Sequence, residues 1–531
     1  MLVWESICGK ALLCYNNFER KISDYMKQTI YQYVANHLDE NGIYTETTLC
    51  DDRFSTIFKP LGTEDAFYYT LNMQSNSRTA STLVKELREY IANPCQQSST
   101  KLYKALKGVV FAEYCDPFVE AFGIDDMNLI AYELARRFFY NAQNREQVKF
   151  AILLFGLHGM EKIKAAEPLL WEDLVKLAHC EEFTFAFLYA CRLTNFTPQQ
   201  EVWQLIRCTC GWGKVFAIID FKCCTDEERL WLLENGIEIN VEYPPLSVKF
   251  IKEIKLMQLL QQPLPYNLYK SAVVIIGNYL ILLNHFPIEM IEENFNIQDI
   301  DLYSMLCSLL QQAQKQAEKP EDILDMLSLA TALWQLAEEQ NLSQLTFNQC
   351  QLLIAECEKI VYAKDWKADI LANLIKDGSI NYQICDLAYE MDLDIWPLLY
   401  EYWLTHPKEV NLMPYLLSYD GGGRSQIVLQ QFENNLPLYT AEPDALLVPL
   451  RYLNTHPGMG ENIICAALES IYDLPRGIAC GILDDWGREF MTPAVKQSLI
   501  KARSLSNNDV VTARIDCLLQ GRKFDISKFL K

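Results

Sequence analysis

Apolar residues recur every three or four positions along most of the chain, with polar positions between them. The clearest example is the stripe Trp212, Val215, Phe216, Ile219 and Cys223. A period near 3.6 residues places such positions on one face of an α-helix. The pattern therefore predicts a chain built mainly of amphipathic helices from about residue 80 onward.

Start and stop signals punctuate this helical pattern. Thr225 begins the run T-D-E-E, in which Glu228 completes a capping box, and the pair Asn235-Gly236 ends the helix that follows. Pro320 and the two acidic residues after it predict another helix start, because acidic side chains suit the positive end of a helix. These signals predict short helices joined by tight turns.

Strand signals are confined to the early part of the chain. The segment 43–50, IYTETTLC, follows an Asn-Gly pair and is rich in β-forming residues. The segment 66–73, AFYYTLNM, has a similar composition and could pair with it. We therefore expect a small β hairpin near residues 43–73.

Two short echoes suggest internal duplication. The pattern YxxTHP occurs at 402–407 and again at 452–457, and WGKxF at 212–216 is echoed by WGRxF at 486–490. The first interval is close to the length of one helical-hairpin repeat. We expect an all-α fold, an α-solenoid of stacked helical hairpins. Its expected parts are an N-terminal helical segment with the β hairpin at 1–95, a first helical-repeat region at 96–310 and a second, acidic one at 311–531.

Strings of short capped helices with weak repeats resemble the HEAT and armadillo class of α-solenoids. The run WGKVF at 212–216, followed by WLLENG at 231–236, is similar to a stretch in uncharacterised bacterial helical-repeat proteins. This resemblance covers only these two runs and the residues between them. It implies a helical-repeat fold and carries over no catalytic residue.

Composition and charge exclude several classes of protein. Half of the residues are hydrophobic and 12% are aromatic, which is enough for a well-buried interior. The formal net charge of −22 disfavours nucleic-acid partners, because phosphate backbones are repelled by acidic surfaces. Glu5 stands where a signal peptide carries positive charge, and the most apolar stretch, 271–283, is too short to cross a bilayer and predicts a buried helix. We expect a soluble cytoplasmic protein without nucleic-acid or membrane partners.

Eighteen cysteines fit free thiols in a reducing compartment better than a disulfide framework. Four of them cluster between 207 and 224: Cys208, Cys210, Cys223 and Cys224. Tetrahedral zinc favours CxxC pairs, whereas residues one or two apart on a helix point in different directions. We favour buried structural cysteines at these positions, with a metal site as the alternative, and we expect no cofactor.

The triad Asp484, Asp485 and Glu489 forms the pattern DDxxxE, which resembles the magnesium-binding motif of some isoprenoid cyclases. Carboxylates at this spacing can share one helical face and hold a diphosphate through the metal. A convincing second metal-binding motif does not follow, and Trp486-Gly487 interrupts the helix start. We favour a simpler interpretation, in which the acidic residues cap a helix that continues past Phe490.

Acidic residues gather in the last third of the chain. Between 377 and 473 there are fourteen acidic and three basic residues, and the stretch 271–314 carries five acidic residues and no basic one. One interpretation is a solvated surface that keeps the protein soluble. The sharper hypothesis is a non-catalytic scaffold whose acidic surface binds a basic protein partner through electrostatic steering.

Each hypothesis names its own residues. The scaffold would contact its partner through Asp386, Glu390, Asp392, Asp394 and Glu401. The alternative is a metal-dependent enzyme with a pocket between helices. Its candidate ligands are Cys208, Cys210, Cys223, Cys224, Asp484, Asp485 and Glu489.

Overall fold

The computed structural model describes residues 28–51, 60–70, 75–338, 344–418, 423–440, 443–506 and 508–525. Nearly every element in these ranges is a helix, as the apolar periodicity predicts. Contacts within the chain divide it into two compact units. Unit 1 comprises Met1–Gln316 and Ser328–Lys359, and unit 2 comprises Ala317–Leu327 and Ile360–Lys531. The three-part division expected from the sequence stays a prediction.

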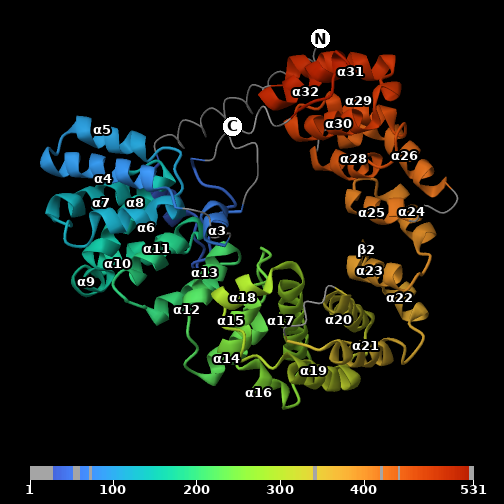
Figure 1. Ribbon diagram of the computed structural model, residues 1–531, viewed down its shortest axis with the longest axis horizontal. Helices are drawn as coiled ribbons and strands as arrows, with labels where there is room; N and C mark the ends of the chain where they lie inside the picture. The colour runs from blue at the N-terminus through green and yellow to red at the C-terminus, as the bar shows by residue number, and fades with distance from the viewer. Residues whose placement is uncertain are drawn as a thin grey trace, which may run out of the picture. The chain divides into compact units, whose positions relative to one another are not determined.

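In the first two thirds of the chain helix follows helix, and most of the connections from α4 onward are short (Figure 1). They are α2 (Ile30–Asn36), α3 (Thr63–Thr70), α4 (Ser77–Ala92), α5 (Gln96–Ala105), α6 (Phe111–Phe122), α7 (Leu129–Asn141), α8 (Arg145–His158), α9 (Met160–Ala166), α10 (Pro168–Ala178), α11 (Glu181–Arg192), α12 (Gln199–Cys208), α13 (Trp212–Asp220), α14 (Asp226–Asn235), α15 (Leu246–Glu253), α16 (Leu256–Leu260), α17 (Tyr266–His285), α18 (Ile288–Asn294), α19 (Leu302–Gln316), α20 (Pro320–Glu338) and α21 (Phe347–Val361). In unit 1, α7 packs on α8, α8 on α11, and α11 on α13. Helices α8 and α11 thus each contact a neighbour in sequence and a helix further along the chain.

Helix α8 lies at the centre of the first of these groups. Its sequence is apolar over most of its length, and nearly all of its side chains are buried. Gly156 faces Ala190 of α11 so closely that a Cβ atom on the glycine would lie 2.7 Å from the Ala190 Cα. The absence of a side chain at Gly156 therefore allows the two helix backbones to approach each other.

The helix-end signals are confirmed where the sequence predicts them. Thr225 and Glu228 form the capping box of α14, and this helix ends at Asn235. Helix α20 begins at Pro320, as predicted. Helix α13 ends at Asp220, so Cys223 lies beyond the apolar stripe to which the sequence pattern assigned it.

Helix α17 contains the most apolar stretch of the sequence. It is long and apolar enough to cross a membrane, but the core helices of globular proteins meet the same criteria of length and composition. Most of its side chains are buried within unit 1, where Tyr279 donates a hydrogen bond to the Gln344 side chain at 2.7 Å. The prediction of a buried helix over 271–283 is confirmed.

The β hairpin expected near residues 43–73 is wrong. Segment 43–50 forms no strand and makes one isolated bridge, between Leu38 and Tyr44, while residues 66–70 belong to α3 and 71–73 lie outside the described residues. Acidic residues in the first turn of α3 and packing against α6 outweigh the β propensity of its aromatic residues.

The small antiparallel sheet that the structure describes lies elsewhere, in unit 2. It pairs β1 (Ile375–Lys376) with β2 (Ser379–Ile380). The connecting residues Asp377 and Gly378 have φ angles of 53° and 78°, the left-handed conformation that a two-residue hairpin turn requires. The Asp-Gly dipeptide was therefore the relevant strand signal in this sequence.

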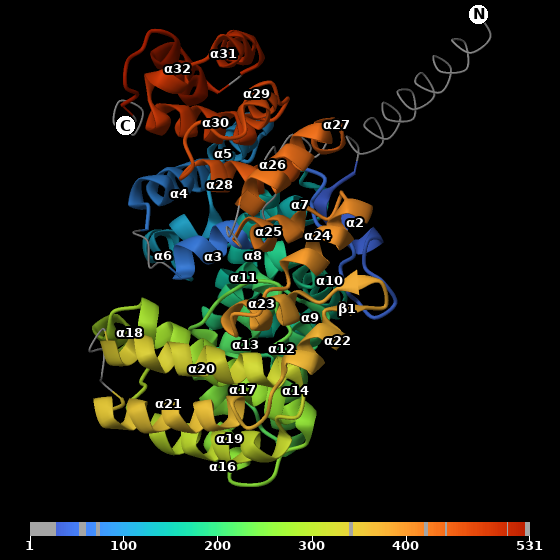
Figure 2. The same cartoon turned by 90° about the vertical axis from the view of Figure 1, so that its right-hand side faces the viewer.

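The rest of unit 2 is helical, and its last helices pack together (Figures 1 and 2). The elements are α22 (Lys367–Asn373), α23 (Tyr382–Glu390), α24 (Trp396–Thr405), η1 (Val410–Leu412), α25 (Met413–Ser418), α26 (Arg424–Asn434), α27 (Leu436–Tyr439), η3 (Pro443–Leu446), α28 (Leu447–Leu453), α29 (Glu461–Leu468), α30 (Asp473–Trp486), η4 (Arg488–Phe490), α31 (Pro493–Leu505) and α32 (Asp509–Leu519). Helix α29 packs on α30 and α31, and α32 packs on both of these.

The YxxTHP echo corresponds to a repeated local structure. In each copy the histidine Nδ1 lies within hydrogen-bond distance of the tyrosine carbonyl oxygen, and the two rings stack with centroids 4.2 Å apart in the first copy and 3.9 Å in the second. Both histidines follow the last turn of a helix, as expected. The WGKxF echo has no such basis, because Trp212 begins α13 whereas Trp486 ends α30.

Candidate functional site

A groove of about 470 Å³ lies in unit 2 between α23 and the segment formed by η1 and α25. Tyr382, Asp386 and Tyr389 face it from α23, where their spacing of four and three residues places them on one helix face. Its other lining residues are Asn411, Pro414, Tyr415 and Ser418. Asp386 is the charged residue in this lining, and the rest is mainly aromatic and polar.

Hydrogen bonds fix the groove's tyrosines. Tyr415 donates to Asp386 Oδ1 at 2.7 Å, and Tyr382 donates to Glu409 Oε1 at 2.7 Å. The rings of Tyr382 and Tyr415 stack with centroids 6.0 Å apart. Burial, and then the neighbouring carboxylate, raises the pKa of both hydroxyls, so they stay protonated and act as donors at neutral pH. The groove is therefore an ordered surface with a carboxylate held in place.

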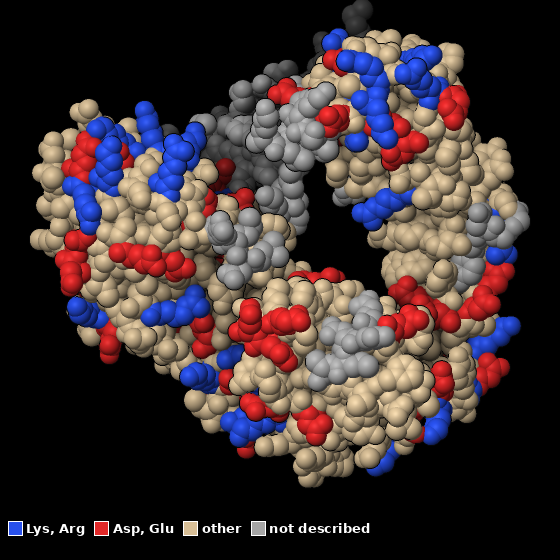
Figure 3. Space-filling view, in the orientation of Figure 1, with Lys and Arg blue, Asp and Glu red and all other residues tan. Residues whose placement is uncertain are grey.

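The five acidic residues expected to contact a partner lie on this part of unit 2, and all five are exposed. Asp386 lines the groove, Glu390 is the last residue of α23, Asp392 follows it in a turn, and Glu401 lies on α24. Asp394 differs from the others, because Arg424 donates two hydrogen bonds to its carboxylate at 2.9 and 2.8 Å. Acidic side chains are visible around α22 and α23 in Figure 3. Among the five, Asp386 combines a lining position with a fixed carboxylate.

The prediction that the clustered cysteines are buried is wrong. Cys210 and Cys224 are exposed, and Cys208 and Cys223 are half-buried. Cys208 is the last residue of α12 and the other three lie in connections between helices, so their side chains lie at the surface rather than between helix faces. Buried thiols occur at other positions instead: Cys50, Cys115, Cys180, Cys191, Cys350, Cys357, Cys385 and Cys480.

These four cysteines make protein contacts that do not resemble a metal centre. The Cys208 thiol donates to the Asn41 carbonyl oxygen at 3.3 Å, and the Cys210 thiol donates to Glu181 Oε1 at 3.4 Å. Within the described residues, no three histidine, cysteine or acidic side chains are grouped in a way that could hold a metal ion. The candidate ligands of the enzyme hypothesis are therefore not brought together there.

The acidic triad also differs from the expected helix cap. Asp484 and Asp485 lie in the last turn of α30, and Gly487, with a φ of 96°, ends this helix. Glu489 lies in the following short helix η4. The prediction of a helix that continues past Phe490 is therefore wrong. Gly487, with its positive φ, ends α30 at the point where the sequence pattern suggested the start of a helix.

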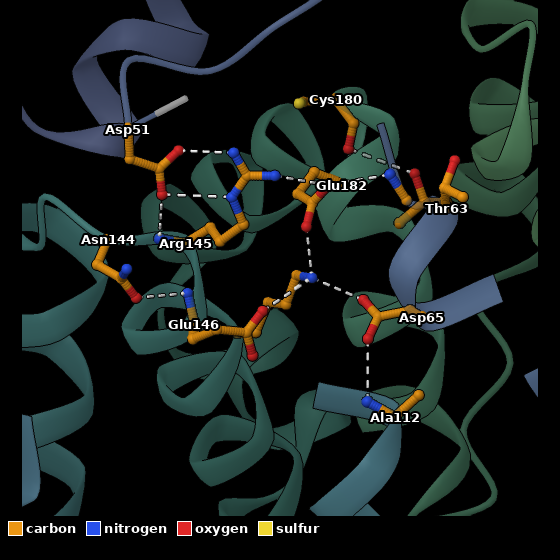
Figure 4. A network of polar contacts seen from close by, with 12 residues as sticks. Asp51, Thr63, Asp65, Ala112, Asn144, Arg145, Glu146, Cys180 and Glu182 are labelled. Atoms are coloured by element: carbon orange, nitrogen blue, oxygen red, sulfur yellow. Dashed lines mark hydrogen bonds and ion pairs between the residues drawn. The ribbon is translucent and has the colours of Figure 1, made fainter. Parts of the chain in front are cut away.

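Unit 1 contains a buried network of charges that sequence reasoning missed (Figure 4). Lys149 Nζ lies 2.7 Å from Asp65 Oδ2, 2.6 Å from Glu182 Oε1 and 3.2 Å from Glu146 Oε1. The Lys149 side chain is 1% exposed. These contacts join α3, α8 and α11, so the network stabilises the packing of unit 1 and is not open to a partner or substrate.

A second cation extends this network. Arg145 Nη2 lies 2.7 Å from Asp51 Oδ1, and Arg145 Nη1 lies 3.2 Å from Glu182 Oε2. The backbone N–H of Gly62 also donates to Glu182 Oε2, at 2.9 Å. Asp51 is therefore attached to α8 by an ion pair, and Gly62, just before α3, to α11 by a backbone hydrogen bond.

The network gives its two glutamates opposite pKa shifts. Burial raises the pKa of Glu146 to about 8, although Lys149 opposes this shift. Burial acts in the same direction on Glu182, but the positive charges of Lys149 and Arg145 outweigh it and hold its pKa at about 2. These shifts favour the neutral form of Glu146 and the ionised form of Glu182 near pH 7. One sequence signal was present, a single lysine inside the apolar run VKFAILLF.

Comparison with known proteins does not identify a family. The chain matches no protein-family model, and neither the curated proteins nor the solved structures provide a significant match. The resemblance to HEAT and armadillo proteins therefore stays a prediction.

Proposed function

We propose that the protein is a non-catalytic binding scaffold, an α-solenoid whose acidic surface in unit 2 binds a basic protein partner. The observation that carries this proposal is the groove between α23 and α25, in which an exposed carboxylate is fixed among tyrosines. The consecutive packing of helices supports the solenoid, since stacked helical hairpins present extended binding surfaces.

The charge distribution supports a basic partner over nucleic acid. The segment 377–473 has a net charge of −11, from fourteen acidic and three basic residues, which is half of the chain's −22. A surface of this kind accelerates encounters with positively charged partners and repels phosphate backbones. Long-range attraction of this kind weakens as salt shortens the Debye length.

The proposal is tested with a five-residue variant, Asp386→Asn, Glu390→Gln, Asp392→Asn, Asp394→Asn and Glu401→Gln. A fluorescent arginine-rich peptide serves as the probe, and its Kd is measured by anisotropy at about 50 and about 300 mM NaCl, which changes the Debye length by roughly 2.5-fold. We expect tight binding at low salt, at least tenfold weaker binding at high salt, and a similar loss in the variant.

The matched control neutralises the five acidic residues of the stretch 271–314, which contains no lysine or arginine: Glu289, Glu292, Glu293, Asp299 and Asp301. These residues are also exposed, and they belong to unit 1. The control variant should bind the peptide as the native protein does. Equal loss in both variants would contradict the assignment of the contact to unit 2, and salt-insensitive binding would contradict electrostatic attraction by the acidic surface.

A further inference from the structure

We infer that the groove between α23 and α25 binds an arginine side chain of the basic partner, with Asp386 as its ion-pair partner. This inference rests on the proposed function, and it names the chemical group that the acidic surface recognises. It is argued from three features of the groove: the free charge of Asp386, the fixed geometry of its carboxylate and the aromatic rings around it.

The charge of Asp386 is not compensated within the described part of the chain. Its contact there is with a neutral donor, the hydroxyl of Tyr415. Asp394, eight residues further on, is already paired with Arg424. A cation from a partner could therefore pair directly with the Asp386 carboxylate. Its binding free energy would not be reduced by the cost of first displacing a basic side chain of the described residues.

The carboxylate of Asp386 is held ready to accept further hydrogen bonds. The bond from Tyr415 fixes the side chain, and Tyr415 itself is half-buried and stacked on Tyr382. A carboxylate oxygen has two lone pairs, so both oxygens of Asp386 can still accept from a planar guanidinium group. Preorganisation of this kind reduces the entropy cost of binding.

The tyrosines favour arginine over lysine. Tyr389 is 54% exposed and lies one helical turn from Asp386, so its ring can cover a guanidinium group that pairs with this carboxylate. A guanidinium group stacks on aromatic rings and donates in its own plane at the same time, whereas a strongly hydrated ammonium group does not. The groove volume of about 470 Å³ also leaves room for the peptide backbone that carries the side chain.

The test compares three peptides with alternating glycine, in which the other residues are arginine, lysine or the uncharged isostere citrulline. Binding is measured by isothermal titration calorimetry at about 50 mM NaCl, where the Debye length exceeds 10 Å. We expect the arginine peptide to bind at least threefold more tightly than the lysine peptide, and the citrulline peptide to lose most of the affinity.

Two variants locate the binding. Asp386→Asn should raise the Kd of the arginine peptide about tenfold, the loss of affinity typical of a charge-assisted hydrogen bond. This variant should fold, because Asp386 is exposed and an asparagine oxygen can still accept from Tyr415. Tyr389→Ala should reduce the preference for arginine over lysine. The matched control is Asp377→Asn, which removes the same charge in the Asp-Gly turn, where asparagine fits equally well; its Kd should change less than twofold.

The outcomes separate this inference from the proposed function. If Asp386→Asn binds normally while the five-residue variant is weakened, the acidic surface stands and the groove assignment is overturned. If neither variant is weakened, both proposals fail. If the lysine peptide binds as tightly as the arginine peptide, the groove recognises charge alone and the arginine assignment is overturned.

Discussion

At the scale of single residues, the main feature of this protein is that two neighbouring buried glutamates have pKa values shifted in opposite directions. Glu146 and Glu182 contact the same lysine, yet the pKa of Glu146 is raised to about 8 and that of Glu182 is lowered to about 2. The difference arises because Glu182 also faces Arg145 and the Gly62 N–H, whereas Glu146 Oε2 is buried without a hydrogen-bond partner. Above its ordinary pKa, Glu146 ionises more easily in the unfolded chain than in the folded protein. Its burial therefore lowers the free energy of unfolding at such a pH.

The sign of the pH dependence follows from these shifts. Glu146 has a folded pKa above its ordinary value of 4.5, so its contribution to stability is full below pH 4.5 and is lost as the pH rises through about 8. Glu182 contributes stability that is present above pH 4.5 and lost as the pH falls through about 2. Unit 1 should therefore become less stable between about pH 4.5 and 8 through Glu146.

The variant Glu146→Gln should remove this loss. We expect the free energy of unfolding to be nearly unchanged at pH 5 and raised by at least about 1 kcal/mol at pH 8, measured by urea denaturation. Glu120→Gln, at an exposed position of α6, is the matched control and should leave the pH profile as it is. A Glu146→Gln profile parallel to that of the native protein would contradict the neutral state of Glu146.

At the scale of helices, close packing decides which sequence changes the fold tolerates. Two helical glycines show the contrast. Gly156 in α8 has Ala190 Cα at 2.7 Å from the position of a Cβ atom, while a Cβ on Gly277 in α17 would meet nothing within 4 Å. The same substitution should therefore have opposite effects at the two positions.

We expect Gly156→Ala to lower the free energy of unfolding by about 2 kcal/mol, because the added methyl group forces α8 and α11 apart. Gly277→Ala should raise it by roughly 0.5 to 1 kcal/mol through higher helix propensity. Thermal denaturation of both variants checks the prediction. Stabilisation by Gly156→Ala would show that α8 and α11 do not approach as closely as described.

At the scale of the whole molecule, each unit contains a buried cation of its own. Lys149 in unit 1 pairs with Asp65 and Glu182. Arg476 in unit 2 is fully buried, pairs with Asp473 and donates to the carbonyl oxygens of Leu468 and Ser470. Because the units are compact by themselves, loss of either cation should act mainly on its own unit.

Hydrogen exchange of Lys149→Met and Arg476→Met tests this expectation. Lys149→Met leaves the buried carboxylate of Asp65 without its ion-pair partner and should cost about 3 to 5 kcal/mol, with faster exchange in α8 and α11. Arg476→Met leaves buried carbonyl groups unsatisfied and should increase exchange in α29 and α30. Each variant is the control for the other. Faster exchange throughout both units in either variant would contradict a division into separate cooperative units.

Charge is also unevenly distributed at this scale. The stretch 377–473 is strongly acidic, whereas α31 carries three basic residues, Lys496, Lys501 and Arg503, and no acidic one. Electrostatic attraction would therefore favour the acidic stretch over α31 as the contact of a basic partner.

The sequence by itself determined the features that depend on neighbouring residues. It predicted the helical content, the capping box at Thr225, the start of α20 and the buried helix over 271–283, because periodicity and capping act within a few turns. From the local excess of acidic residues it also named Asp386 as a candidate contact residue, which stays a prediction. Where a local signal was misread, a competing feature decided the outcome: the acidic first turn and packing on α6 for α3, and Gly487 for the helix around Asp484.

Only the tertiary structure decided which distant residues meet. Lys149 and Asp65 are 84 residues apart in sequence, and Tyr415 and Asp386 are 29 apart, so no periodic pattern connects them. The exposure of the clustered cysteines was decided in the same way, because burial depends on which surfaces other helices cover. The groove exists because α23 and α25 each expose tyrosines that long-range hydrogen bonds and stacking then fix.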